Sequence, residues 1–244
     1  MHIVVCTLFP ELISPFLNTG LLGKAVARGT VNVETINIRD FATDKHHHVD
    51  DVPYGGGPGM VMKPEPLTAC LREAHARCGE DGGHVIYLSP QGPSLTQKRV
   101  VELSNSEKPL ILLNGRYEGI DERVIEAHVD EELSIGDYVL YGGELGSLVI
   151  IEAVTRLLPD GLGNRDSLAE ETHDHGRVEY PQYTRPPEFE GRAVPEVLIS
   201  GHHAQIALWR RRMSLLRTMQ KRPDLIEKFP LTADEIRVLE GRKK

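Results

Sequence analysis

The stretch "LILLNGRYEG" (residues 110–119) begins with four large apolar residues and passes directly into a segment with two glycines. An unbroken apolar run of this length predicts a strand that is buried on both faces, as in a parallel sheet. The stretch "VIYLSPQG" (85–92) has the same layout, and "LSIGDYVLYGG" (133–143) predicts a third strand of this kind. Because the carboxyl ends of parallel strands lie along one edge of a sheet, we expect the three turns to lie together.

Further predicted strands alternate with predicted helices on both sides of these segments. "HIVVCTLF" (2–9) and "VNVETINIRD" (31–40) predict strands, whereas the connection 40–66 predicts no regular element. Apolar residues at helical spacing predict helices over 11–29, 66–78, 96–105, 120–128 and 145–158, the last of them apolar enough to pack on both sides. This alternation predicts an α/β domain with a mainly parallel sheet over residues 1–160.

The rest of the chain has a different composition. Residues 161–176 are rich in Gly, Asp, Asn and His and predict a linker. Residues 177–244 predict a small helical domain, in which "HAQIALWRRRMSLLRTMQKR" (203–222) is a long helix and Thr232 and Glu235 form a capping box before a short one.

Charge is distributed unevenly between these two parts. The formal net charge is −8, yet residues 177–244 carry 14 lysines and arginines against 9 acidic residues, and the preceding part carries 14 against 27. A basic segment on an acidic body indicates a polyanionic partner. On the predicted long helix, the candidate contacts to nucleic-acid phosphates are Arg210, Arg211, Arg217 and Lys221, with a merely solvated basic face as the alternative.

Overall composition favours a reduced, cytoplasmic globular protein. Hydrophobic residues make up 40% and charged residues 26% of the chain, and no apolar stretch reaches membrane-spanning length. The first residues lack the features of a signal peptide. The three cysteines form no CxxC pair, which argues against a structural zinc site.

Glycine-rich strand ends are well suited to bind a small molecule. Without a Cβ atom the main chain approaches a ligand closely, and free N–H and C=O groups can read a flat heterocycle; the alternative is that the glycines only shape tight turns. "YGGGPGM" (54–60) does not fit a standard phosphate-binding loop, and "KHHHVDD" (45–51) is typical of a solvated loop. Arg156 lies inside an apolar helix, where it needs either an anion or an internal pair with Glu152.

Six motifs, in order along the chain, closely resemble the bacterial tRNA (guanine-N1)-methyltransferases, which are knotted SPOUT methyltransferases: "YGGGPGM", "YLSPQG", "GRYEGIDERVI", "SIGDYVLYGGEL", "YTRP" and "SGHHAQIALWR". The resemblance implies a deep trefoil knot and a homodimer whose active sites combine both chains. It also implies transfer of a methyl group from S-adenosylmethionine to N1 of the guanine on the 3′ side of the anticodon, in the anticodon stem-loop of tRNA. The family is magnesium-dependent, and the sequence offers no ligand set that locates the ion.

By motif match the resemblance also assigns roles to single residues. It implies that Arg156 stabilises negative charge on guanine O6 and that Asp166, in the linker, is the general base. Gly146 stands where the family has a proline. The residues that would contact the methyl donor are Tyr87, Leu88, Ser89, Pro90, Gly115, Tyr117, Glu118, Ser134, Ile135, Gly136, Asp137, Tyr138, Val139, Leu140, Gly142 and Gly143.

Two other functions are compatible with part of these features. A non-catalytic RNA-binding regulator that senses S-adenosylmethionine would bind both ligands and form no methylated product. A metabolite-binding α/β enzyme would leave the basic helix without a role. Product analysis with a labelled donor and unmodified tRNA separates these functions.

Overall fold

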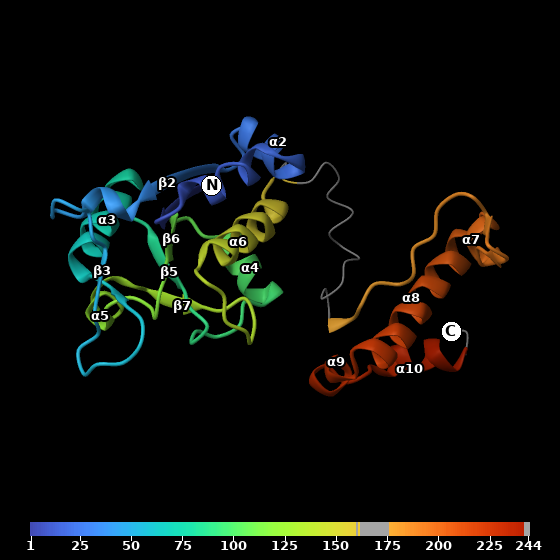
Figure 1. Cartoon of the computed structure of the whole chain (residues 1–244). Coiled ribbons are helices and arrows are strands. Elements are labelled where there is room, and N and C mark those ends of the chain that lie inside the picture. Colours follow the sequence, from blue (N-terminus) through green and yellow to red (C-terminus); the bar gives the residue numbers. More distant parts are fainter. Residues whose placement is uncertain (160, 162–175, 242–244) are drawn as a thin grey trace. The chain divides into compact units, whose positions relative to one another are not determined.

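The chain consists of two compact units, Met1–Gly163 and Asn164–Lys244. The computed structural model describes residues 1–159, 161 and 176–241. The first unit holds a five-stranded sheet with helices on its faces, and the described part of the second consists of helices and a short hairpin (Figure 1).

The sheet of the first unit is parallel throughout. It contains β1 (His2–Thr7), β2 (Asn32–Asn37), β5 (His84–Leu88), β6 (Leu110–Asn114) and β7 (Glu131–Leu133), in the order β2-β1-β6-β5-β7. Side chains of β1 alternate between two buried clusters, with Ile3 and Val5 in one and Val4 and Cys6 in the other. Because both faces are covered, the central strands β1, β5 and β6 are largely apolar and buried, and the predicted α/β fold class is confirmed.

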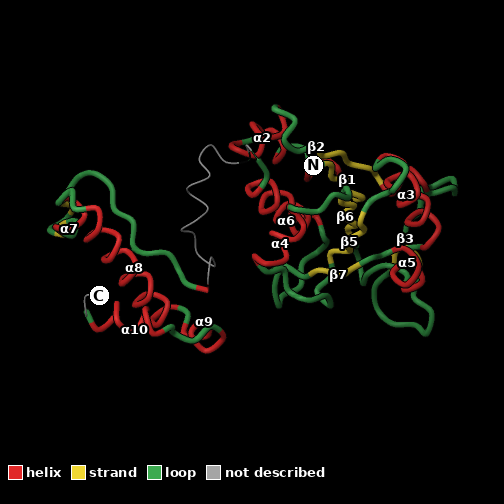
Figure 2. Tube along the Cα trace, turned by 180° about the vertical axis from the view of Figure 1, so that it is seen from behind, coloured by secondary structure: helices red, strands yellow, loops and turns green. Residues whose placement is uncertain are grey.

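Helices cover the two faces of this sheet (Figures 1 and 2). On one face lie α2 (Gly20–Ala27), α4 (Gln97–Ser104) and α6 (Glu144–Leu157), which supply apolar side chains to the cluster that contains Ile3. On the other face lie α3 (Pro64–Arg77) and α5 (Glu122–His128), with a short helix η2 (Ile38–Phe41) beside them. The helices predicted over 66–78, 96–105 and 120–128 are therefore confirmed.

Two predicted elements differ from the structure near the amino terminus. The helix expected over 11–29 is divided into α1 (Pro10–Ile13), η1 (Phe16–Asn18) and α2, because Pro15 lacks an N–H and Gly20 adopts a φ of 62°. The connection 40–66 contains a small antiparallel hairpin of β3 (Asp50–Asp51) and β4 (Val61–Met62), which is too short to leave a periodic signal.

The strand expected over 133–143 is also wrong. β7 ends at Leu133, and residues 134–143 form a loop whose first turn is closed by the Ser134 hydroxyl, which accepts from Gly136 N at 3.1 Å. Serine–backbone bonding competes with strand pairing, so residues 134–143, which alternate like a strand, form a loop instead.

The helix α6 that follows this loop is not packed on both sides within the chain, because Leu145 and Val149 are exposed at 58% and 45%.

The described part of the second unit consists mainly of helices. They are α7 (Glu196–Ile199), α8 (His203–Lys221), α9 (Pro223–Lys228) and α10 (Ala233–Glu240), preceded by a hairpin of β8 (Glu188–Phe189) and β9 (Arg192–Ala193). The long helix α8 and the capping box of Thr232 and Glu235 before α10 are confirmed. Among the described residues, no helix combines the length and the apolar character needed to cross a membrane.

Candidate active site

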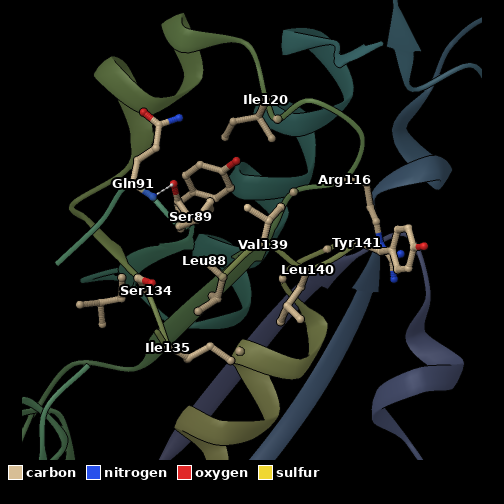
Figure 3. A pocket seen from close by; sticks show the side chains of 18 of the residues that line it. Leu88, Ser89, Gln91, Arg116, Ile120, Ser134, Ile135, Val139, Leu140 and Tyr141 are labelled. Atoms are coloured by element: carbon tan, nitrogen blue, oxygen red, sulfur yellow. Dashed lines mark hydrogen bonds between the residues drawn. The ribbon is translucent and has the colours of Figure 1, made fainter. Parts of the chain in front are cut away.

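A pocket of about 320 Å³ lies at the carboxyl ends of β5, β6 and β7. Most of its walls come from three segments that are distant in sequence, the end of β5 with the residues that follow it, the turn that follows β6 and residues 133–143 (Figure 3). The expectation that the three glycine-bearing turns lie together at one edge of the sheet is confirmed.

Fifteen of the sixteen residues that the resemblance assigns to donor binding line this pocket, and Asp137 does not. The motif match left out several lining residues, some within the strand-end segments and some in the helices beyond them. Glu122 and Ile125 come from α5, at a spacing that places them on one face of that helix. The missed residues are Gln91, Arg116, Gly119, Ile120, Glu122, Ile125, Leu133, Tyr141 and Gly146.

The glycines at the pocket wall are required by space. A Cβ atom at Gly143 would lie 2.8 Å from Asn114 Oδ1 and 2.9 Å from Leu88 Cβ, and one at Gly115 would lie 2.8 Å from the Tyr87 hydroxyl. The Gly143 N–H also donates to Gly115 O at 3.2 Å, so two main-chain segments run in direct contact. Neither glycine has a positive φ, which excludes the alternative that these two serve only the dihedral angles of tight turns.

Two tyrosines give the pocket hydroxyl groups, which form directional hydrogen bonds. Burial, with a smaller contribution from Glu132, raises the pKa of Tyr87 to about 12, so its hydroxyl stays protonated at physiological pH. Tyr117 adopts a φ of 59°, a conformation that costs a non-glycine residue free energy and is concentrated at functional sites. Its ring is half exposed, and burial followed by the nearby Asp50 carboxylate raises its pKa.

The pocket fits a cationic nucleoside such as S-adenosylmethionine. Apolar side chains of Leu88, Ile135 and Leu140 offer contacts to a flat ring, and main-chain groups at the glycines offer hydrogen bonds. Glu118, an acidic residue, also lines the pocket, and a carboxylate attracts a positively charged centre.

Of the two residues that the resemblance makes catalytic, only Arg156 lies within the described residues. Arg156 is half-buried on the last turn of α6, about 18 Å along the helix axis from Glu144 at its start, and does not line the pocket. Asp166 lies outside the described residues. The described part of one chain therefore does not bring the candidate arginine to this pocket.

The four basic residues predicted on α8 fall into two groups. Arg211 and Lys221 are exposed, whereas Arg210 and Arg217 are half-buried. The guanidinium of Arg210 lies 4.8 Å from the ring centroid of Tyr180, a cation–π contact inside the second unit. Arg210 therefore has a packing role as well as its charge.

The histidine-rich segment is an exposed loop. The carboxylate of Asp44 accepts from the main-chain N–H groups of His46 and His48 and pairs with the His48 ring at 2.7 Å. Within the described ranges, no group of three or more His, Cys, Asp and Glu side chains is placed to hold a metal ion. The described residues therefore do not locate the magnesium ion that the resemblance implies.

Comparisons of the sequence with known proteins point to a single family. A family model described as "tRNA (Guanine-1)-methyltransferase TrmD" matches residues 1–228. Three curated relatives named "tRNA (guanine-N(1)-)-methyltransferase" align over 98% of the chain. The protein of Pseudomonas fluorescens strain SBW25 is 53% identical with 95% of its length covered, that of Proteus mirabilis 52% with 94%, and that of Pelotomaculum thermopropionicum 49% with 95%.

Proposed function

Because the chain belongs to the family of tRNA (guanine-1)-methyltransferases and is a methyltransferase, we propose that it methylates N1 of the guanine on the 3′ side of the tRNA anticodon, with S-adenosylmethionine as donor. The observation that carries the donor is the pocket, which gathers three glycine-bearing segments around one cavity with an acidic side chain in its wall. The proposed substrate, tRNA, places the reaction in the cytoplasm.

The chemistry of the base requires a proton acceptor and a cation. Guanine N1 carries a proton and becomes nucleophilic when that proton leaves, so we assign Asp166 as the carboxylate that accepts it. Negative charge then develops on O6, and the fixed guanidinium of Arg156 stabilises it in the transition state. S-adenosylmethionine supplies a methyl group on a sulfonium centre. The pocket residues hold this group in line with N1, which lowers the entropic part of the barrier.

A homodimer with shared active sites accounts for the position of Arg156. Within one chain this residue lies at the far end of α6 from the pocket, so a second copy is a suitable source of the guanidinium. Exposed apolar side chains on α6 and on the adjoining α1 and η1 form a surface suited to such a partner: Leu12, Phe16, Leu145 and Val149.

The proposal includes the deep trefoil knot of the SPOUT fold. After β7 the loop 134–143 returns across the sheet edge, where Gly142 pairs with Arg116 in an isolated antiparallel bridge and Gly143 bonds to Gly115. This return past β5 and β6 supports a threaded chain path. The domain arrangement proposed is a methyltransferase part over 1–160, a linker over 161–176 and a tRNA-binding part over 177–244.

Basic side chains of the second unit are proposed to hold the anticodon stem-loop by its phosphates. The exposed Arg211 and Lys221 are free of the packing role of Arg210 and are the better test residues. Changing both to Glu should weaken tRNA binding and reduce its salt dependence without changing donor affinity. Unchanged tRNA affinity would show that this basic face of α8 contacts solvent and not tRNA.

The decisive experiment is a methylation assay with labelled S-adenosylmethionine and unmodified tRNA, followed by mapping of the modified nucleotide. We expect one N1-methylguanine on the 3′ side of the anticodon, and loss of product with Asp166→Asn and Arg156→Ala while donor binding persists. Binding of both ligands without product would indicate a regulator. A product at another position would contradict the proposed target.

A further inference from the structure

A cluster of four side chains adjoins the pocket through Arg116; we call Thr7, Phe9, Arg116 and Glu144 the anchor cluster. The Glu144 carboxylate, in a residue that is 2% exposed, accepts from the Thr7 hydroxyl at 2.8 Å. Arg116 donates to it from Nε at 3.3 Å and pairs with it through Nη2 at 2.9 Å. The Phe9 N–H donates to the Thr7 hydroxyl at 2.9 Å, and the Arg116 guanidinium lies 4.4 Å from the Phe9 ring centroid.

The anchor cluster joins three parts of the chain at this edge, beside a second buried set of bonds in which Asn114 donates to Cys6 O and accepts from the Ser147 hydroxyl. Thr7 ends β1, Arg116 belongs to the turn after β6, and Glu144 is the first residue of α6. Arg116 lines the pocket, whereas Thr7 and Glu144 do not. Glu144 therefore does not line the pocket itself and reaches it through its partner Arg116.

The neighbouring glycines depend on this arrangement. A Cβ atom at Gly142 would lie 2.3 Å from Arg116 Nε and 2.7 Å from Glu144 Oε2, so only glycine leaves room for the ion pair. Gly142 and Gly143 have no side chains with which to fix their own position. Their main chain is instead held against Arg116 and Gly115 by the isolated bridge and by the Gly143 N–H.

Burying a carboxylate and a guanidinium together is costly unless their hydrogen bonds are satisfied. Here Glu144 also lies at the start of a helix, where the helix dipole favours a negative charge. Directional bonds of this kind fix orientation more sharply than apolar packing does, because an error in angle loses the bond. The buried ion pair therefore has a use that offsets its cost: it orients the main chain at Gly142 and Gly143, which have no side chains of their own to hold them.

We propose that Glu144 is a positioning residue, which acts through Arg116 to hold the 115–119 turn and the start of α6 in the donor-binding geometry before the donor arrives. Such preorganisation lowers the ordering cost of binding. Loss of the Glu144 charge should therefore weaken donor binding and loosen the local main chain, although no atom of Glu144 touches the ligand.

The test compares Glu144→Gln with Glu152→Gln, a matched change at an exposed position of the same helix. Calorimetry with S-adenosylmethionine should show a dissociation constant raised at least about tenfold for Glu144→Gln and unchanged for Glu152→Gln. Hydrogen exchange should be faster at the amides of 115–119 and 142–147 in Glu144→Gln, with β5 and β6 protected as before. Glu144→Asp, which keeps the charge, should restore part of the affinity.

A Glu144→Gln chain with lower thermal stability but wild-type donor affinity and wild-type exchange at both segments would overturn the proposal. Where that variant fails to fold, Thr7→Val carries the test, since it removes one donor to Glu144 and keeps the shape of the side chain; unchanged affinity and exchange would then be the contradicting result. Because the identity of the ligand rests on the proposed function, a wild-type chain that does not bind S-adenosylmethionine overturns that function, whereas the exchange comparison tests the role of Glu144 by itself.

Discussion

At the scale of single residues, the shape of the pocket depends on glycines, whose lack of a Cβ atom lets neighbouring segments approach closely. Gly115, Gly142 and Gly143 bring main chain and buried side chains within distances that no Cβ atom tolerates. At each of these three glycines a substitution is opposed by neighbouring atoms, whereas at Gly191, which has open space and a φ of 72°, it is opposed by the backbone conformation alone.

Gly142→Ala should damage both the pocket and the fold. The new methyl group would force apart Arg116 and Glu144, so we expect a loss of about 1–3 kcal/mol in the free energy of unfolding and at least tenfold weaker donor binding. Thermal unfolding and calorimetry on the full chain measure the two effects.

Gly146→Ala is the matched control for that change. Its Cβ atom would lie 3.0 Å from Leu88 Cδ1, the flexible end of a side chain, and alanine is favoured over glycine in a helix by about 1 kcal/mol. We expect near wild-type stability and donor affinity within about threefold. Equal damage from the two substitutions would contradict the role given to the ion pair.

At the scale of elements, the described part of the second unit contains a half-buried ion pair between Arg177 and Glu235. Arg177 donates to the Glu235 carboxylate from Nε and from Nη2, both at 2.9 Å, and to Phe229 O at 2.9 Å. Glu235 also completes the capping box of α10. Arg177, near the start of the described part of this unit, and α10 are thereby joined at one carboxylate.

This carboxylate predicts an acid-sensitive second unit. The Arg177 guanidinium lowers the pKa of Glu235 from 4.5 to about 2. A lowered folded-state pKa contributes stability that is present above the ordinary value and is lost as the pH falls from about 4.5 to 2. Trp209, the single tryptophan of the chain, lies in α8 and reports on this unit by fluorescence.

Thermal unfolding followed by Trp209 fluorescence should therefore show a midpoint that falls across this pH range. Glu235→Gln should lower the midpoint at neutral pH and flatten its dependence on acid. A variant with the same acid dependence as the wild type would assign the effect to other carboxylates.

Elements with strong local signals were predictable from sequence, and those that depend on distant partners were not. The strands β1, β5 and β6 are recognisable because burial on both faces requires unbroken apolar runs. The loop 134–143 imitates a strand in its alternation, and its true form depends on the Ser134 turn and on contacts with Gly115. Glu144 gave no signal because its partner Thr7 is 137 positions away.

At the scale of the whole molecule, the separation of Arg156 from the pocket predicts that single chains are catalytically incomplete. Arg156→Ala keeps an intact pocket, and Gly143→Val keeps an intact arginine but fills the wall beside Leu88 and Asn114. If two chains share each site, co-expressing these inactive variants should restore up to about one quarter of the wild-type activity, through mixed dimers.

Each variant purified alone provides the control and should remain inactive. A co-expressed pair that stays inactive, although mixed dimers are detected by mass spectrometry, would place Arg156 and the pocket of the same chain in one site.

The most direct measurement of the central claim is a crystal structure of the chain with S-adenosylmethionine bound. We predict that the donor lies against residues 87–90, 115–118 and 134–143, with its cationic end toward the Glu118 carboxylate and its ring among Leu88, Ile135 and Leu140. A donor found at another surface, with these three segments left as they are in the free chain, would contradict the account.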